Sequence, residues 1–353
     1  MLYYLIPYFF ITFLSLNIYF KKLKVTWQML LFLLLPAILV AGLKGNVGTD
    51  SIFYLGLLED YRLYGDSLMR YEPGYELLNK IIVYMGATPR LGVAIIAVIS
   101  TAILSVAYSR SRNEMILLAL IVFPLYFYDF TMNGLRYGLS FCIATLAVDA
   151  LYRKNFFYVA VWGIMAFTMQ YSSLLIILLF LSVLVPKKYL IIFLILLTLI
   201  FLVSPNSFAF FTDRISDKQN LYTEIFAPSF VSGLAPLLTV LILYINFLYF
   251  HRGLKYSKLI HIIMIAEILS FVMAKFTYAG LRFQGAFMYG MILYLKNNTK
   301  LDQLHWRYIT VFFIMSIFSI LVFFKNITTV VEDNYTPFLP YKFFWEEKYQ
   351  DRL

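Results

Sequence analysis

The sequence is poor in cysteine, histidine and charge, and each shortage excludes a class of protein. It has one cysteine, Cys142, which rules out a disulfide within the chain and a cysteine-based metal cluster. The three histidines are too few and too scattered for a zinc or di-iron site. Charged residues make up only 14% of the chain, against about 25% in a typical soluble domain. We therefore expect no metal, no cofactor and no disulfide framework.

Apolar residues are abundant instead. The chain is 62% hydrophobic and 19% aromatic, with a mean hydropathy of +0.79. No soluble domain of this length needs so much apolar surface, whereas a bundle of membrane spans does. Helices are expected because no alternating strand pattern is present and open strands cannot cross a bilayer. The composition thus predicts an all-α, polytopic membrane helix bundle.

Apolar runs recur along the chain and predict about 12 transmembrane helices, with a range of about 10 to 14, because one span takes about 20 apolar residues. The runs lie at residues 2–20, 26–43, 91–108, 115–131, 135–151, 156–171, 173–185, 189–203, 231–250, 259–276, 281–295 and 308–324. A further apolar stretch at 76–87 predicts a re-entrant or interfacial helix. With no internal repeat and no separable soluble segment, we expect one membrane domain over residues 1–353. The first run lacks a basic flank and a cleavage site, so we expect it to be a retained span.

The joints between these runs alternate in charge. One set is short and basic, holding 15 Lys and Arg against three acidic residues. Short basic loops resist translocation, so this set is predicted to face the cytoplasm. The other set then faces outward, including a large loop at 44–90 after the second span, a loop at 204–230 and a C-terminal tail at 326–353. The net charge of +10 is therefore an orientation signal, and no nucleic-acid partner is expected.

The outward loop at 44–90 concentrates acidic residues. Asp50, just past the second span, is a candidate general base or an anchor for a sugar hydroxyl; the alternative is a turn or helix cap. Glu72 lies between Tyr71 and a Pro73-Gly74 turn that precedes Tyr75. Carbohydrate sites often pair carboxylates with aromatic faces, which favours a sugar-binding role for this stretch. The alternative is that Glu72 caps a helix starting near Tyr75.

Arg136 is the leading candidate cation. Asp129, Asn133, Arg136 and Ser140 recur at helical offsets and so share one face. An inward-pointing Arg136 can clamp a phosphate through two parallel hydrogen bonds; the alternative is a structural network with Asp129. The joint formed by Gln170, Ser172 and Ser173 either lines the same cavity or forms a turn.

Lys275 and Arg282 are further outward cations near the start of a late span. Cations that meet at one depth suit a pyrophosphate headgroup, although single ones are more often interfacial anchors. Glu267 is predicted near the centre of a span, where a carboxylate is costly. It is therefore a candidate proton relay, a buried partner of a cation such as Lys275, or a helix-packing residue.

With these pieces in place, the chain resembles the EpsG family of polysaccharide polymerases, relatives of the Wzy-type O-antigen and capsule polymerases. The resemblance rests on short motifs in a fixed order: Gly48-Thr49-Asp50, Tyr71-Glu72-Pro73-Gly74, Asn133-Gly134-Leu135-Arg136, Gln170-Tyr171-Ser172-Ser173, Arg282 and Pro340-Tyr341-Lys342. Two positions depart from the family pattern. Tyr137 stands where the family commonly has Gln, and Gln170 where it often has His, so more weight falls on the carboxylates.

The resemblance implies a multi-pass glycosyltransferase on the outer face of the bacterial cytoplasmic membrane. It would join oligosaccharide repeat units carried on undecaprenyl pyrophosphate, without a nucleotide sugar or a metal. Arg136 and Arg282 would offset charge on the departing pyrophosphate, and Asp50 or Glu72 would take the proton from the attacking hydroxyl. The residues expected to bind substrate are Tyr71, Tyr75, Asn133, Tyr137, Gln170, Ser173, Lys275 and Tyr341. A chain-length regulator and a flippase of the same pathway are expected partners.

Three other functions stay open at this stage. A flippase or other transporter often shows internal repeats and broken spans with charges at mid-membrane; here no repeat is found, and only one such charge. A membrane O-acyltransferase would call for an outward or membrane-embedded histidine. An O-antigen ligase uses the same donor and differs only in its acceptor, so the sequence barely separates it from a polymerase.

Overall fold

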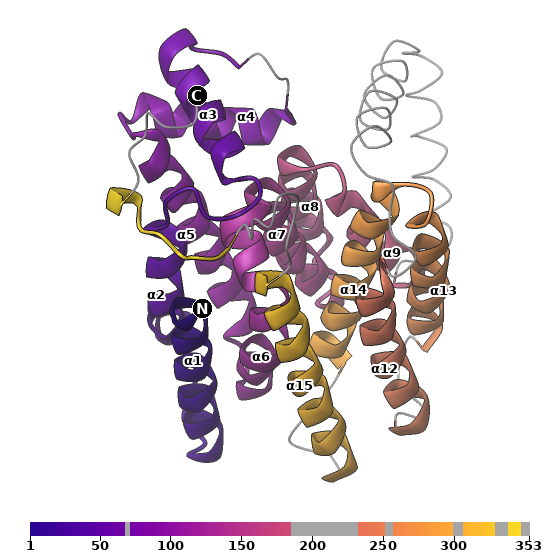
Figure 1. Ribbon diagram of the computed structural model, residues 1–353. Coiled ribbons are helices and arrows are strands. Elements are labelled where there is room, and N and C mark those ends of the chain that lie inside the picture. Colours follow the sequence, from indigo (N-terminus) through magenta and orange to yellow (C-terminus); the bar gives the residue numbers. More distant parts are fainter. Residues whose placement is uncertain (68–70, 185–231, 251–256, 299–305, 329–337, 347–353) are drawn as a thin grey trace, which may run out of the picture. The chain divides into compact units, whose positions relative to one another are not determined.

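The computed structural model describes residues 1–67, 71–184, 232–250, 257–298, 306–328 and 338–346. These described residues are mainly helical and contain no strand, although an isolated antiparallel bridge joins Lys44 and Phe343. The helices, shown in Figure 1, are α1 (Leu2–Phe20), α2 (Trp27–Gly42), α3 (Ser51–Tyr64), α4 (Pro73–Tyr84), α5 (Pro89–Tyr108), α6 (Arg112–Leu117), η1 (Leu118–Phe127), η2 (Asp129–Asn133), α7 (Leu135–Tyr152), α8 (Phe156–Met169), α9 (Ser173–Leu184), α12 (Leu234–Phe250), α13 (Ser257–Met273), α14 (Tyr278–Asn298), α15 (Trp306–Thr328) and η5 (Phe344–Glu346).

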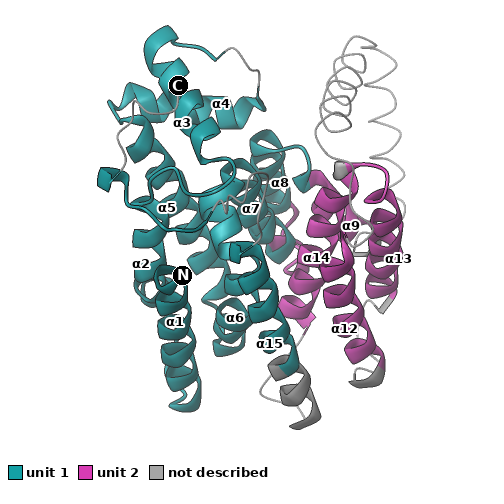
Figure 2. Ribbon diagram, viewed as in Figure 1, with its two compact units in different colours: residues 1–149, 157–173, 300–353 teal, residues 150–156, 174–299 magenta. Residues whose placement is uncertain are grey.

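The helices group into two compact units, which Figure 2 shows in different colours. Unit 1 comprises residues 1–149, 157–173 and 300–353, and unit 2 comprises residues 150–156 and 174–299. Unit 1 therefore contains the segment after α2 that is predicted to face outward, together with the start of α7. Unit 2 contains α12, α13 and α14. That the chain acts as one domain in the membrane stays a prediction.

The helices are apolar enough to place the chain in a membrane. Among the described residues, α1, α5 and α7 are long and apolar enough to cross a bilayer, and further apolar helices are shorter. Every predicted run except 189–203, which lies outside the described residues, overlaps one of the helices. The prediction of an all-α membrane protein is thus confirmed. The count of about 12 spans stays a prediction, because within the described part of the chain only three helices reach the length and hydropathy expected of a span.

Local sequence explains where the helices in unit 1 begin. The hydroxyl of Thr26 accepts a hydrogen bond from the backbone N–H of Met29 at the start of α2 (3.3 Å), and the hydroxyl of Thr88 accepts one from Leu91 N–H at the start of α5 (3.4 Å). These side chains satisfy backbone donors that a helix leaves unpaired at its start. Pro89 follows Thr88 as the first residue of α5, where its missing N–H is no loss.

The segment after α2, predicted to be a large outward loop, contains two helices. Helix α3 forms because Tyr54, Leu58 and Tyr61 recur at helical spacing and are buried on one face. Helix α4 overlaps the apolar stretch predicted at 76–87. It buries Tyr75, Asn79 and Ile82, while its opposite face is exposed. Figure 1 shows α3 and α4 together at one end of unit 1, beyond the ends of α2 and α5.

A buried π-helical segment, η1 and η2, runs through unit 1 and leads to α7. Its core is aromatic: the rings of Phe123 and Phe127 stack with their centroids 4.7 Å apart, and both side chains are fully buried. Helix α15 packs against it through Phe323, whose ring stacks on Tyr128 at 5.8 Å. Wide-turn segments of this kind are frequent at functional sites, and this one ends three residues before Arg136.

The described part of the C-terminal tail, residues 338–346, lies against the end of α2 and the start of α1. The Tyr341 hydroxyl donates to the carbonyl oxygen of Val40 (2.8 Å), and Gly45 N–H donates to the carbonyl of Lys342 (2.8 Å). Of the other predicted outward segments, 204–230 and the tail residues 329–337 and 347–353 lie outside the described residues, and 326–328 belong to α15. Which side of the membrane this end of unit 1 faces stays a prediction.

Candidate functional site

A buried ion pair between Glu72 and Arg136 forms the centre of the candidate site in unit 1. Glu72 directly precedes α4 and Arg136 is the second residue of α7, so 64 positions separate them. Arg136 Nη1 donates to Glu72 Oε2 over 2.7 Å, a length typical of a charge-assisted hydrogen bond. The side chains are only 15% and 2% exposed, respectively. Glu72 makes no side-chain cap bond to α4, so its main described contact is with Arg136 and not with the helix end.

Aromatic rings line one side of the Glu72–Arg136 ion pair. The guanidinium carbon of Arg136 lies 5.0 Å from the centroid of the Tyr71 ring, within the range of a cation–π interaction. Tyr75, almost fully buried, continues the wall at 6.3 Å from Tyr71, and Tyr54 of α3 lies 6.3 Å from Tyr75. The site therefore presents a carboxylate, a guanidinium and aromatic faces together, the combination that suits a charged carbohydrate ligand.

The environment keeps the hydroxyl of Tyr71 protonated. Burial raises the pKa of Tyr71 to about 12, with the charge of Arg136 acting in the opposite direction and that of Glu72 adding to the rise. Burial likewise raises the pKa of Tyr75 well above its ordinary value. Neither tyrosine is thus a proton acceptor near neutral pH, and both serve as faces or hydrogen-bond donors.

A backbone hydrogen bond and a close packing contact position the stretch from Tyr71 to Gly74. Glu76 Oε1 accepts a hydrogen bond from Tyr71 N–H over 2.6 Å. A Cβ atom at Gly74 would lie 2.5 Å from Thr168 Oγ1 near the end of α8, so a larger residue does not fit there without a shift. The close approach brings the stretch that carries Glu72 against the end of α8, just before Gln170.

Asp50 and Asn133 lie on a neighbouring loop that is tied to the end of η2. Asn133 Oδ1 accepts a hydrogen bond from Thr49 N–H over 2.9 Å. Gly48 has a φ of +106°, and a Cβ there would lie 2.9 Å from Asn133 Oδ1, so glycine is required for this contact. Asp50 is exposed, stands at the N-cap position of α3 without making a cap bond, and forms no ion pair with a described cation.

The joint between α8 and α9 is a compact, internally bonded turn. Ser173 Oγ donates to the carbonyl oxygen of Gln170 (2.9 Å), and Gln170 Nε2 donates to Ser172 Oγ (2.9 Å). Ser140 of α7 also donates to the Gln170 carbonyl, at 3.4 Å. Gln170 and Ser173 are buried. These contacts favour the turn interpretation of the joint, and a role in binding substrate stays a prediction.

Two other predicted binding residues are anchored in the protein. The Tyr137 ring contacts Phe141 of α7 at 4.2 Å and Phe130 of η2 at 5.2 Å. Tyr341 is buried, packs against Tyr3 at 4.9 Å, and donates its hydroxyl to the Val40 carbonyl. Burial with nearby Tyr3 and Glu346 raises the pKa of Tyr341. Their predicted binding of substrate is not tested by these contacts.

The remaining predicted cations, Lys275 and Arg282, belong to unit 2. Lys275 Nζ donates to the carbonyl of Ser232 over 2.7 Å and lies 4.0 Å from the centroid of the Phe271 ring. Arg282 of α14 is exposed. Glu267, fully buried in α13, accepts a hydrogen bond from Gln284 Nε2 over 2.8 Å, a partner that the sequence analysis did not consider.

Among the described residues, no group of three or more His, Cys, Asp or Glu side chains is placed to hold a metal ion. A second cationic cluster in unit 1, formed by Lys44 and Arg90, was not predicted from the sequence. The available signal was that both lie in a segment predicted to face outward, where the positive-inside rule disfavours unexplained basic residues.

The motif order that suggested a family is supported by comparison with known proteins. The sequence model of the EpsG family matches residues 25–343, nearly the whole chain. The chain belongs to the EpsG family. EpsG is the family of Wzy-type polymerases, so the predicted resemblance is confirmed. No curated protein and no solved structure gives a match. Membership in EpsG assigns the chain to polysaccharide biosynthesis as a membrane protein with a glycosyltransferase-like polymerase role.

Proposed function

We propose that this EpsG-family chain joins undecaprenyl-pyrophosphate-linked oligosaccharide repeat units at the outer face of the bacterial cytoplasmic membrane. The product would be a surface polysaccharide such as an O-antigen, a capsule or an exopolysaccharide. The observation that carries the proposal is the buried Glu72–Arg136 pair beside the Tyr71 ring. It places an anion-binding group and a proton acceptor in contact, next to an aromatic face that suits a sugar.

The reaction needs both groups. The hydroxyl of the acceptor sugar attacks the anomeric carbon of the donor chain, a new glycosidic C–O bond forms, and the bond from that carbon to the pyrophosphate oxygen breaks. The proton of the hydroxyl passes to a carboxylate, and the pyrophosphate leaves on its lipid carrier. No nucleotide sugar enters this balance, because the donor already carries its leaving group.

Arg136 is proposed to stabilise the negative charge that develops on the departing pyrophosphate. Its Nε atom is buried and has no hydrogen-bond partner among the described residues, so it has a donor left for a ligand oxygen. A pyrophosphate that draws the guanidinium toward itself also draws it from Glu72. The released Oε2 of Glu72 can then accept the proton of the attacking hydroxyl.

Asp50 is the second candidate for the proton acceptor. It is exposed at the start of α3, on the loop that Asn133 binds. Asn133 itself lies three residues before Arg136 in the sequence. Glu72 is preferred because it contacts the guanidinium directly. The role predicted for Arg282 on the leaving group is independent of this preference.

The test begins with deletion of the gene and a gel of surface polysaccharide. Accumulation of single repeat units on the carrier is expected for a polymerase, whereas intermediates retained on the cytoplasmic side would instead indicate a flippase. Complementation with Arg136→Gln or Glu72→Gln should leave single repeat units, with the variant protein still present in the membrane.

The matched control is the Glu59–Arg62 pair of α3, which has the same residue types at 3.6 Å but is far less buried, with Arg62 52% and Glu59 28% exposed. Glu59→Gln and Arg62→Gln should restore the full polymer ladder. Normal ladders from both Arg136→Gln and Glu72→Gln would overturn the proposed roles. Asp50→Asn, tested in parallel, separates the two carboxylates, because only the variant that lacks the acceptor should fail.

A further inference from the structure

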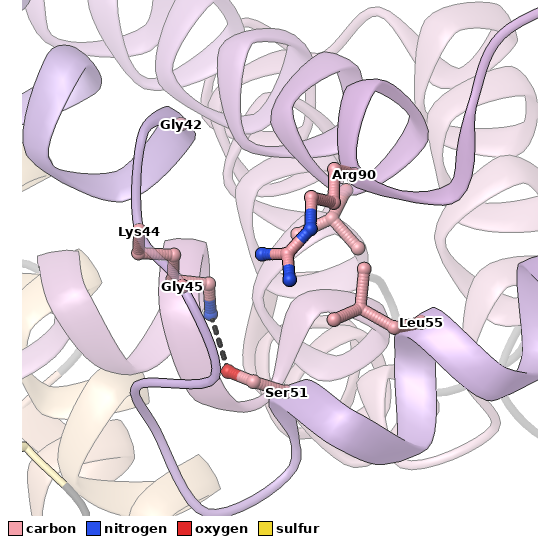
Figure 3. Close-up of a pocket in the computed structure, with 7 residues that line it drawn as sticks. Gly42, Lys44, Gly45, Ser51, Leu55 and Arg90 are labelled. Atoms are coloured by element: carbon pink, nitrogen blue, oxygen red, sulfur yellow. Dashed lines mark hydrogen bonds between the residues drawn. The ribbon is translucent and has the colours of Figure 1, made fainter. Parts of the chain in front are cut away.

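A small pocket in unit 1 brings together two cations that the proposed reaction does not yet use. It lies where α2 ends and where α3 and α5 begin. Its lining residues are Gly42, Lys44, Gly45, Ser51, Leu55, Arg90 and Val93. Figure 3 shows the guanidinium of Arg90 and the ammonium of Lys44 directed into the same space, with Ser51 beside them.

Lys44 is a buried cation. The residue is only 5% exposed. Its Nζ atom donates hydrogen bonds to Ser51 Oγ, over 2.7 Å, and to the carbonyl oxygen of Met132. No described carboxylate forms an ion pair with it, although the charge of Asp50 acts on it from nearby. An ammonium has three N–H donors, so one is left for an acceptor in the pocket.

Burial makes the positive charge on Lys44 unfavourable in the absence of an anion. It lowers the pKa of Lys44 from 10.5 to about 7, while the charge of Asp50 acts in the opposite direction. Outward lysines normally extend into water to keep their hydration. A lysine held inside the protein next to an arginine therefore requires an explanation beyond orientation in the membrane.

Arg90 and two helix ends add to the positive potential of the pocket. The terminal guanidinium nitrogens of Arg90 are buried, and the guanidinium keeps its charge at every physiological pH. Ser51 is the first residue of α3 and Arg90 the second of α5. The start of a helix carries a partial positive charge and unpaired N–H donors. Two cationic side chains and two helix starts thus converge on one space.

The size of the pocket indicates what kind of group fits. The room inside it is about 10 Å³, the volume needed by one water-sized group. It therefore admits a single oxygen atom of a larger ligand that approaches from the open mouth, and its cations select an oxyanion. An uncharged sugar offers no negative charge to these cations.

We propose that this pocket binds a phosphoryl group of the pyrophosphate that the reaction retains, on the acceptor chain. This inference rests on the proposed function. Joining two carrier-linked chains brings two pyrophosphates to the protein: one departs with the donor's carrier and one stays on the product. Arg136 serves the first, and Lys44 with Arg90 holds the second.

The same residues that line the pocket connect it to the candidate site. Lys44 bonds to the carbonyl of Met132, and the adjacent Asn133 holds Thr49. Met132 and Asn133 end η2, just before Arg136 in α7. One short segment, from Met132 to Arg136, therefore joins the pocket to the guanidinium that acts on the donor.

The test measures binding of undecaprenyl pyrophosphate to the full-length protein in nanodiscs. Arg90→Gln should raise the Kd at least about tenfold, because a charge-assisted hydrogen bond is lost. Lys44→Met should do the same, and Lys44→Arg should retain most of the affinity. The control is Lys80→Gln, which removes an exposed lysine of α4 that pairs with Asp66 at 3.4 Å and should leave the Kd unchanged.

Two further probes identify the source of the phosphoryl group. Inorganic pyrophosphate should compete with undecaprenyl pyrophosphate in the wild type and compete less well in Arg90→Gln. Phosphatidylglycerol in the nanodisc should compete weakly. If Arg90→Gln weakened association with phosphatidylglycerol while leaving the Kd for undecaprenyl pyrophosphate unchanged, the pocket would hold a bilayer headgroup and the proposal would fail. Unchanged affinity in both Arg90→Gln and Lys44→Met would also overturn it.

Polymer gels from the same variants separate this proposal from the proposed function. If Arg136→Gln abolishes polymer while Arg90→Gln and Lys44→Met leave both polymer and binding intact, the pocket proposal fails and the polymerase site stands. If Arg90 is needed for binding while Arg136→Gln and Glu72→Gln give normal polymer, the pocket stands and the roles proposed for the ion pair fail.

Discussion

Arg136 in unit 1 and Arg282 in unit 2 occupy similar places in the sequence, yet the structure gives them different surroundings. Each lies near the start of an apolar helix, α7 or α14, after a short polar joint. Arg136 is largely buried, bonded to Glu72 and covered by the ring of Tyr71. Arg282 is exposed. Position in a helix therefore does not determine the environment of an arginine; partners from distant segments do.

The difference has an energetic consequence. A buried charge that loses its partner is strongly destabilising, whereas an exposed charge is surrounded by water and its loss has little effect. The protein thus depends on Glu72 and Arg136 as a unit.

The largest effect is expected from breaking the buried pair on one side. Arg136→Gln leaves the Glu72 carboxylate buried without its cation and should lower the free energy of unfolding by about 3–5 kcal/mol. The double variant Arg136→Gln/Glu72→Gln should recover most of that loss, because no unpaired charge remains. Denaturant unfolding of the purified protein in detergent measures all three proteins.

Arg282→Gln is the comparison in this experiment. Its side chain is exposed, so its effect on stability should stay within about 0.5 kcal/mol. An equal loss of stability in Arg136→Gln and Arg282→Gln would contradict the distinction between the two arginines. Recovery of stability without recovery of polymer in the double variant would show that the pair has a role in the reaction beyond folding.

The sequence was sufficient for much of the fold, because apolar runs report helices directly. It placed helices at nearly every position where the structure has an apolar one, and the charge of the joints predicted an orientation. It missed α3, whose buried positions at Tyr54, Leu58 and Tyr61 are interrupted by charged residues such as Glu59 and Asp60. An amphipathic helix of this kind has too little apolar length to stand out among membrane spans.

For the site, the sequence identified the residues of the central pair but not their pairing. It assigned Glu72 and Arg136 as candidates and weighed Asp129 as the structural partner of Arg136. The contact between positions 72 and 136 depends on how the α4 segment folds back onto α7, which local spacing does not encode. For the same reason the pocket of Lys44 and Arg90 went unnoticed, since its members come from the ends of two different helices.

An effect of pH is also expected, and it concerns the second cationic cluster. The pKa of Lys44 is about 7 in the folded protein and 10.5 in a hydrated chain, so between these values the unfolded state binds more protons. Stability contributed by this residue therefore rises as the pH increases from about 7 to about 10.5. The wild type should gain thermal stability across this window relative to Lys44→Met, as measured by melting temperature.

Arg282→Gln provides the reference for that titration as well. Its pH profile should follow that of the wild type, because an exposed guanidinium keeps its charge throughout this range. Parallel profiles for wild type and Lys44→Met would contradict the burial of a lysine in this pocket. A rise confined to the wild type and Arg282→Gln would assign it to Lys44.

The smallest effect is expected at Tyr71, the aromatic partner that distinguishes Arg136 further. The interaction uses the face of the ring, 5.0 Å from the guanidinium carbon, so Tyr71→Phe should keep it. Tyr71→Leu removes the ring, and a cation–π interaction at a partly desolvated site is worth about 0.5–2 kcal/mol. Polymerisation rate should therefore fall roughly twofold to thirtyfold in Tyr71→Leu, with little change in Tyr71→Phe. The pattern depends on Arg136: in an Arg136→Gln background, the two Tyr71 variants should become indistinguishable, and a persistent difference there would mean that the ring acts on the sugar instead of on the cation.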